Sequence, residues 1–235
     1  MEDHHIETLP TDIRNLIDRQ SDHFTSTTRA AVGDPRDWPE HGLAWLCLEH
    51  FQFSRRNPSF LQQAANNTRA LTPNGISDEL ERNYEEEKTH AEIYRRALGD
   101  IGIDVAARVE FAPTTMFLDK INQLVEGDPF GTLGAMYATE TAAIFEHQVF
   151  RDISVELIAR RNAGDRGKRL VRFHDMHLEG VEQAHKDNLG VFLRPSELPD
   201  SDRGFNGAMV NEGASRAISA MTEWWAELLK ARVSG

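Results

Sequence analysis

Cysteine is almost absent from this chain of 235 residues, in which Cys47 is the single example. An intramolecular disulfide is therefore excluded, and the apolar flank LAWLCLEHF predicts a buried, unreactive thiol. No apolar run approaches the roughly eighteen residues that a transmembrane helix needs. The N-terminus also lacks the basic start and the apolar stretch of a signal peptide. The sequence thus predicts a cytoplasmic protein without a membrane partner.

Positive charge is in short supply as well. The chain has 26 Lys and Arg residues against 38 Asp and Glu residues, which gives a formal net charge of −12. No basic cluster is available to neutralise phosphate groups, so nucleic acids and anionic membranes are excluded as partners. A small-molecule substrate is the remaining kind of ligand, and the acidity itself mainly predicts solubility.

Alternating strand-like runs are missing too, whereas apolar residues recur at steps of three and four along most of the chain. This periodicity predicts an all-α protein, and the length suits one helical domain over residues 1–235. Ser77 is the expected N-cap of the third helix, and residues 194–208 are the longest expected irregular connection. The seven predicted helices cover residues 11–31, 39–66, 76–99, 114–126, 129–161, 166–193 and 209–232.

Two of these helices carry the same short motif, Glu-x-x-His. It occurs as Glu87 and His90 in NYEEEKTHAEIYRRAL, and as Glu182 and His185 in HDMHLEGVEQAH. Residues three apart on an α-helix lie about 60° apart on one face, so each pair can bind one ion. A single pair arises often by chance among exposed glutamates. Two pairs are typical of helical bundles that bind two metal ions with inward-pointing carboxylates.

Another helix supplies a further carboxylate. Glu140 stands alone in GAMYATETAAIF, a weakly polar stretch that predicts a buried helix. Glu86 is a rival of Glu87, and Glu49 and Glu146 are reserve ligands. Mixed carboxylate and imidazole ligands with open coordination positions favour iron or manganese, and such iron(II) sites commonly activate dioxygen. Zinc is disfavoured because structural zinc sites favour cysteine.

His177 needs a special backbone to join this set. In a regular helix it lies five residues, about 140°, from Glu182 and cannot reach the same ion. A π-bulge inserts one residue and makes the five-residue step equivalent to a four-residue step, and Gly180 lowers the resistance to such a bulge. We therefore expect His177 to be a ligand. His174, about 12 Å from Glu182 along a regular helix, is expected either to support a ligand from behind or to line the pocket, the alternative being a hydrogen-bonded core histidine.

Together these segments resemble a known family. The runs EHFQFSRRNPSFLQQAANNTRA, NYEEEKTHAEIYRRALGDIGI, TLGAMYATETA and RFHDMHLEGVEQAHKDNL, within about residues 40–193, are similar to the haem-oxygenase-like di-metal oxidases and oxygenases. This group includes the chlamydial death-domain-associating protein. The resemblance implies a seven-helix bundle that binds two iron ions through three core helices. The implied ligands are Glu87 and His90, then Glu140, then His177, Glu182 and His185.

The chain departs from the family at its last motif, which is usually His-x-x-x-Asp-x-x-His. Here one additional residue separates the first His from the acid, and the acid is Glu182 where Asp is usual. The additional residue is the bulge argued above.

The same resemblance implies dioxygen-dependent chemistry on a small metabolite, in which an external electron donor can take part. The substrate would be a free amino acid or a similar carboxylate, and the setting natural-product biosynthesis. Desaturation, cyclisation, fragmentation and oxygenation are all reactions open to such a site. An arginine can grip a carboxylate with two hydrogen bonds, and aromatic side chains can line an apolar pocket. The residues expected to bind substrate are Arg55, Arg56, Arg172, Phe53, Tyr137 and His174.

Two other interpretations stay open. One is a helical protein-interaction module whose metal site is vestigial. The other is a thiaminase-like or cofactorless branch of the same fold, which would need an exposed nucleophilic cysteine or no metal ligands at all. Trp224 and Trp225 stand side by side near the C-terminus. One is expected to pack in the core, and the other is available for a homodimer contact.

Overall fold

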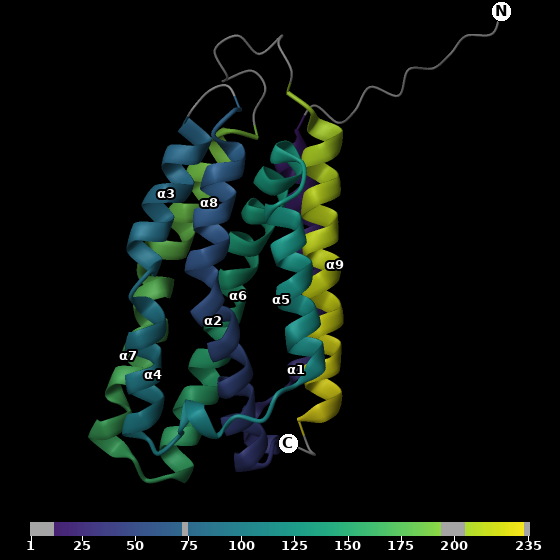
Figure 1. The fold of residues 1–235 in the computed structure, drawn as a ribbon. Helices are drawn as coiled ribbons and strands as arrows, with labels where there is room; N and C mark the ends of the chain where they lie inside the picture. The colour runs from purple at the N-terminus through teal and green to yellow at the C-terminus, as the bar shows by residue number, and fades with distance from the viewer. Residues whose placement is uncertain (1–11, 72–74, 194–204, 233–235) are drawn as a thin grey trace, which may run out of the picture.

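Helices account for the regular structure of this protein. The computed structural model describes residues 12–71, 75–193 and 205–232, and within these ranges it contains no β-strand (Figure 1). The predicted all-α class is confirmed. The α-helices are α1 (Ile13–Val32), α2 (Glu40–Thr68), α3 (Gly75–Glu87), α4 (His90–Asp100), α5 (Ala112–Val125), α6 (Pro129–Arg160), α7 (Lys168–Met176), α8 (Glu182–Val191) and α9 (Gly207–Ala231).

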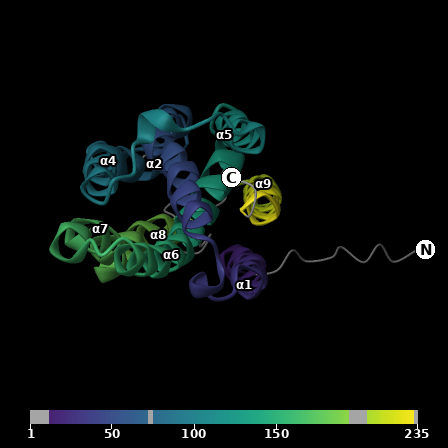
Figure 2. The same cartoon turned by 90° about the horizontal axis from the view of Figure 1, so that it is seen from below.

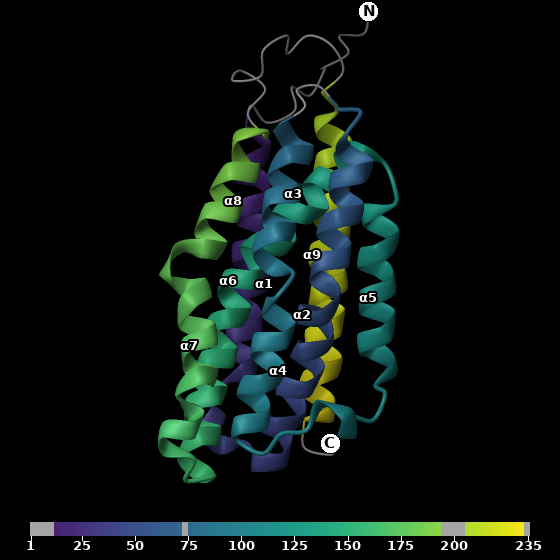
Figure 3. The same cartoon turned by 60° about the vertical axis from the view of Figure 1, so that its left-hand side comes forward.

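Two of the seven predicted helices are interrupted. Figure 3 shows α3 stacked on α4 and α8 stacked on α7, so that each pair forms one rod and the count of seven rods is as predicted. The predicted helix 76–99 breaks at Lys88 and Thr89. Past this break the amide of Glu92 bonds the carbonyl of Thr89 at 3.2 Å, a three-residue step that restarts the helix. The other rod is kinked at Gly180, in the five-residue turn His177–Val181.

The helix α6 runs through the centre of the bundle. Figure 2 shows α4, α2 and α5 on one side and α7, α8, α6 and α1 on the other, with α9 at one end. Because α6 packs against α1, α2, α5, α7, α8 and α9, it has no solvent face along much of its length. Residues 131–142 are buried throughout, as the weakly polar stretch predicts. A polar side chain on α6 is therefore forced into the interior.

Glycines allow α6 and α9 to approach closely. A Cβ atom added at Gly134 would lie 1.9 Å from the carbonyl oxygen of Val210, and one added at Gly213 would lie 1.9 Å from that of Gly131. Both obstacles are backbone atoms, which cannot rotate away. Only glycine fits these two positions at the observed helix separation.

Two local expectations are corrected by the packing, and a third falls mostly outside the described residues. Ser77 is not an N-cap, because α3 begins at Gly75 and the Ser77 hydroxyl donates to the carbonyl of Ala65 on α2 at 2.7 Å. Trp224 and Trp225 are both 1% exposed, so neither presents a surface to a second copy. The expectation for residues 194–208 falls mostly on residues outside the described ranges.

Two other expectations are confirmed. Cys47 is fully buried, and burial raises the pKa of its thiol to about 12. In the described part of the chain, no helix is both long and apolar enough to cross a membrane.

Replacing Gly134 by alanine tests the close contact between α6 and α9. We expect Gly134→Ala to lower the free energy of unfolding by about 3 kcal/mol, because a backbone clash forces the two helices apart. Chemical denaturation measures the change. Gly99→Ala is the control, since an added Cβ there meets nothing within 4 Å, and it should leave stability unchanged or raise it by up to about 1 kcal/mol. Equal effects of the two substitutions would contradict the close contact.

Candidate metal centre

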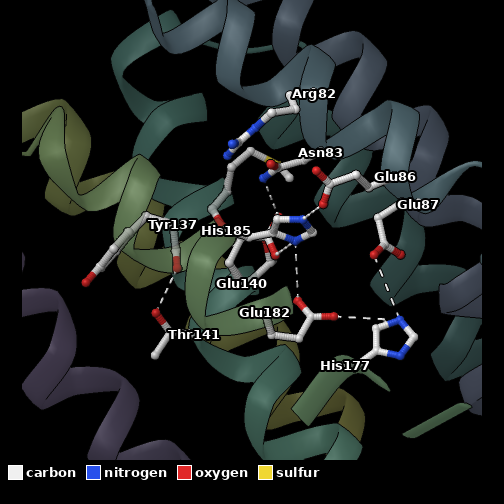
Figure 4. A network of polar contacts seen from close by, with 12 residues as sticks. Arg82, Asn83, Glu86, Glu87, Tyr137, Glu140, Thr141, His177, Glu182 and His185 are labelled. Atoms are coloured by element: carbon white, nitrogen blue, oxygen red, sulfur yellow. Dashed lines mark hydrogen bonds and ion pairs between the residues drawn. The ribbon is translucent and has the colours of Figure 1, made fainter. Parts of the chain in front are cut away.

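All six predicted ligands meet in the interior of the bundle. Glu87 ends α3, His90 begins α4, Glu140 comes from the middle of α6, and the rod of α7 and α8 supplies the rest. Figure 4 shows the side chains of Glu87, Glu140, His177, Glu182 and His185 pointing toward one another. Each of the six is buried, with no more than 8% of its surface exposed. The six are Glu87, His90, Glu140, His177, Glu182 and His185.

One half of this cluster is formed by Glu87, His90 and His177. His90 Nδ1 lies 2.9 Å from Glu87 Oε1 and 3.1 Å from His177 Nε2, and His177 Nε2 lies 3.9 Å from Glu87 Oε1. Ligand atoms that share one transition-metal ion at about 2.1 Å each lie about 3 to 4 Å apart. The three side chains therefore have the spacing of ligands to one ion.

The other half is formed by Glu140, Glu182 and His185. His185 Nδ1 lies 3.5 Å from Glu140 Oε2 and 3.7 Å from Glu182 Oε2. The second oxygen of Glu182, Oε1, lies 3.8 Å from His177 Nε2 in the first half. Glu182 thus directs one carboxylate oxygen toward each half.

The predicted interruption of the helix between His177 and Glu182 is present and brings His177 into the cluster. Its form is a kink in the turn His177–Val181, where Gly180 has the non-helical φ 125° and ψ −8°. An L-residue rarely adopts this conformation, so the glycine permits the turn. His177 Nδ1 donates to the carbonyl of Phe173 at 2.7 Å. Because Nδ1 carries the proton, Nε2 of a neutral His177 presents its lone pair to the cluster.

Glu86 and Glu87 are neighbours with different roles. Glu87 points into the cluster, whereas the side chain of Glu86 is 47% exposed and reaches His185 from the rim. Glu86 Oε2 accepts from His185 Nε2 at 2.9 Å (Figure 4). A carboxylate that binds the outer nitrogen of a histidine orients the ring and makes its inner nitrogen a better metal ligand. Glu87 therefore faces the cluster as a candidate ligand, and Glu86 orients the ring of His185 from the rim.

Burial and neighbouring charges shift the pKa values of the cluster residues in different directions. Burial raises the pKa of Glu182 well above its usual range, and the nearby carboxylates of Glu140 and Glu87 add to the effect. Burial alone would lower the pKa of His185, but the carboxylates of Glu140 and Glu182, 3.5 and 3.7 Å from its Nδ1, outweigh it and raise the pKa to about 12. For Glu87 burial opposes ionisation, yet the contact with His90 wins and lowers the pKa. The raised pKa of Glu182 is that of a buried carboxylate without a sufficient cationic partner, whereas His90 supplies such a partner to Glu87.

The buried glutamates and histidines could hold metal ions. Glu87 Oε1 and His185 Nδ1 are buried without a hydrogen bond of normal geometry, although both face the cluster. Three groups of buried side chains also place one ligand atom each within 4.8 Å of one another. Unsatisfied polar atoms that converge in this way are expected where an ion completes the site. The groups are Glu87 with His90 and His177, His147 with His177 and Glu182, and Glu87 with Glu182 and His185.

His147 belongs to the site, but the sequence analysis missed it. Its Nε2 lies 3.5 Å from Glu182 Oε1, and its ring stacks on that of His177 with centroids 3.9 Å apart. Its Nδ1 lies 3.1 Å from His174 Nδ1. Burial lowers the pKa of His147 well below its usual range, so the ring is neutral. Its spacing in the sequence could have identified it. His147 lies seven residues after Glu140, so the two residues lie on the same face of α6, two turns apart.

A small cavity adjoins the cluster on the side of α2. Its volume is about 30 Å³, room for a group of one or two heavy atoms. Phe53, predicted to line a pocket, does so, together with His50, another histidine that the sequence analysis missed. The remaining lining residues are Ser54, Asn57, Glu87, Thr139, Glu140, Ala143, Glu146, His147, Phe173, His177 and Glu182.

The other predicted substrate residues lie elsewhere. Arg55 and Arg56 border a separate surface hollow, and Arg172 pairs with Glu179 at 2.7 Å on the surface. The Tyr137 hydroxyl donates to Asp18 at 2.8 Å, so the ring points toward α1 and away from the cluster (Figure 4). His174 is fully buried and bonds His147 behind the cavity wall. The structure therefore brings none of these five residues to the cavity.

The two reserve glutamates also lie outside the cluster. Glu49 is bound by both arms of Arg108, at 2.9 and 2.8 Å, and by the Thr114 hydroxyl at 2.6 Å. Glu146 accepts from Trp225 Nε1 at 2.9 Å, and burial raises the pKa of its carboxyl to about 7. Glu49 is a structural ion pair, whereas Glu146 faces the cavity.

Metal uptake should release protons. At neutral pH the raised pKa values of Glu182 and His185 keep protons on the metal-free cluster, and an incoming ion displaces them. We expect at least one proton per chain on addition of zinc(II) at pH 7, recorded with an indicator dye in weak buffer. Apparent affinity should fall as the pH is lowered from 8 to 6. Uptake with no proton release and no pH dependence would contradict this description of the cluster.

Gly180→Ala should damage both stability and metal binding. An alanine at φ 125° costs about 1 to 3 kcal/mol of backbone strain and favours a regular helix, which turns His177 away. Chemical denaturation and metal analysis measure the two effects. Gly164→Ala is the control, because Gly164 also has a positive φ, 49°, with open space around it, but lies outside the cluster. The control should lose stability and keep its metal. Full metal content in Gly180→Ala would contradict the role of the turn.

Comparisons with known proteins agree with this architecture. No protein-family model and no curated protein shows a significant match to the sequence. Among solved structures, a CADD-like protein of unknown function from Nostoc punctiforme PCC 73102 is similar, with a TM-score of 0.74 and 20% identity over 93% of this chain and 98% of that one. CADD stands for chlamydia protein associating with death domains.

Two further structures share the fold at lower identity. A TenA homologue from Pseudomonas syringae pv. tomato has a TM-score of 0.71 and 12% identity over 92% of each chain. A domain of unknown function with a haem oxygenase-like fold, from Shewanella denitrificans OS217, has a TM-score of 0.67 and 12% identity over 92% of this chain and 90% of that one. The chain therefore has the haem oxygenase-like fold and is similar in structure to CADD-like proteins and TenA homologues.

Proposed function

We propose that this chain is a non-haem di-iron enzyme, an oxidase or oxygenase that uses dioxygen to modify a small metabolite. The observation that carries the proposal is the position of Glu182, whose two oxygens face His177 and His185 respectively. Helical bundles that bind two metal ions hold them with inward-pointing glutamates and Glu-x-x-His pairs from several helices, and this chain offers the same kinds of residue.

The chain's own residues define what the site can do. Glu87, His90 and His177 would hold one ion, and Glu140, Glu182 and His185 would hold the other. Two iron(II) ions in such a site supply the electrons and open coordination positions that dioxygen activation requires. The carbonyl of Phe173 fixes the tautomer of His177, and Glu86 fixes the ring of His185. Both contacts keep the ligand nitrogens aimed before an ion arrives.

The choice of iron rests on the ligand set. Oxygen and imidazole ligands without thiolate suit iron and manganese better than the soft metals. Cys47 is no ligand, since its contact is with Tyr94. On the cavity side, Phe53, Phe173 and Ala143 provide an apolar wall that restricts water around the cluster. A substrate group held against this wall would be the one that reacts. The substrate or an external donor would supply the remaining electrons that the reduction of dioxygen requires.

The alternative interpretations receive less support. A thiaminase-like activity needs a nucleophilic thiolate, whereas burial raises the pKa of Cys47 to about 12. A cofactorless enzyme or an interaction module gives no reason for six buried, converging ligands, since unpaired buried carboxylates cost stability. The particular reaction and the metabolic setting, natural-product biosynthesis, remain part of the proposal.

Iron binding provides the direct test. Anaerobic titration of the metal-free protein with iron(II) should reach close to two ions per chain, and exposure to air should then consume dioxygen. His90→Ala and His177→Ala should each lose at least one ion and nearly all oxygen consumption, while circular dichroism shows unchanged helix content. His23→Ala, at an exposed position on α1, is the matched control and should behave as wild type. A folded wild-type protein that takes up no iron would favour the interaction module.

A further inference from the structure

Glu146 is a buried carboxylate that the metal cluster does not use. Its side chain lies on α6, is 2% exposed and lines the cavity beside the cluster. Trp225 Nε1 donates to its Oε1 at 2.9 Å, which holds the carboxylate in place from α9. Its other oxygen, Oε2, has no hydrogen-bond partner among the described residues. A fixed acceptor with a free oxygen beside a cavity is the arrangement of a ligand-binding group.

The charges around the cavity leave Glu146 without a partner. No lysine or arginine appears among the residues that line the cavity in the described ranges. A buried, unpaired carboxylate is costly, so a cationic ligand would gain from binding here.

We propose that Glu146 binds the ammonium group of a small primary amine and that this amine is the substrate class of the site. The proposal rests on the di-iron function proposed above. An ammonium group carries three N–H donors, and the same lining offers further acceptors in the Ser54 hydroxyl and the Asn57 amide. The cavity of about 30 Å³ matches an ammonium nitrogen with one carbon. Phe53 and Ala143 suit the apolar remainder of such a molecule.

A carboxylate anchor has no comparable support in the described cavity. The three arginines that the sequence offered for this purpose, Arg55, Arg56 and Arg172, lie away from the lining. A free carboxylate beside Glu146 would meet another negative charge without compensation. The site therefore recognises the amine of its substrate, and a carboxylate group, where one exists, would lie beyond the cavity.

The indole N–H of Trp225 is a reporter of this interaction, because it bonds Glu146 directly. In ¹H–¹⁵N spectra of the zinc(II)-loaded protein, which is diamagnetic, the Trp225 signal can be assigned with Trp225→Phe. Titration with methylamine at pH 8 should shift this signal saturably, with a Kd on the order of 10 mM for a ligand of two heavy atoms. Methanol, its neutral counterpart of equal size, should bind at least tenfold more weakly.

Substitutions identify the binding group. Glu146→Gln keeps the shape and removes the charge, and it should weaken methylamine binding at least tenfold. Glu156→Gln is the matched control on the same helix, ten residues and about 15 Å further along, and it should leave the Kd unchanged. The comparison of methylamine with methanol in the wild-type protein needs no variant, so a folding defect in Glu146→Gln would not remove the test.

Three results would overturn the proposal. They are equal responses to methylamine and methanol, unchanged affinity in Glu146→Gln, and the absence of any saturable shift in the wild-type protein. A response of Trp225 to a third equivalent of zinc(II) in place of the amine would assign Glu146 to a metal ion instead. The titration requires neither iron nor turnover and can be repeated on metal-free protein. Failure of amine recognition is therefore distinguishable from failure of the di-iron function.

Discussion

The cost of burying charge governs this molecule. Glu87, Glu140, Glu146 and Glu182 all lie in the interior, where removal of a carboxylate from water is expensive without a cation or a set of hydrogen bonds. At Glu49 the protein itself offsets this cost. Two guanidinium nitrogens of Arg108 and the hydroxyl of Thr114 donate hydrogen bonds to its carboxylate. In the described ranges no arginine lines the cavity beside the cluster, so metal ions would be the cations that balance these carboxylates.

The same constraint explains the irregular backbone at the site. Both rods that supply Glu-x-x-His are interrupted at or beside the motif, by the break at Lys88 and Thr89 and by the turn at Gly180. A straight helix directs only one narrow face toward the interior, whereas an interruption changes the direction in which a single side chain points. Glu87 and His90 thus converge across a helix end, and His177 joins Glu182 across a five-residue step. Strain in the backbone is offset where the side chains find shared partners.

Much of this arrangement was predictable from the sequence, since local spacing determines it. The seven rods follow from helical periodicity, the two Glu-x-x-His pairs from their spacing, and the bulge from Gly180 between His177 and Glu182. The unpredicted features depend on contacts between distant segments. His147 and His50 are single histidines whose role appears once α2, α6 and α7 pack together. Tyr137 and the three arginines have the right chemistry but point elsewhere, because α1 and the solvent offer them partners.

The position of Glu146 could not be determined from the spacing of residues along one helix. As a residue in a helix it is indistinguishable from Glu140, six positions earlier on the same buried helix, and both were reasonable ligands. The difference comes from α9, whose Trp225 holds Glu146 by one oxygen, while Glu140 faces His185 on α8. A donor from a tryptophan is neutral, so it positions the carboxylate without balancing its charge. The packing of α9 therefore separates two equivalent glutamates into a metal ligand and a free anionic group beside the cavity, where a positively charged substrate would be oriented toward the metal centre.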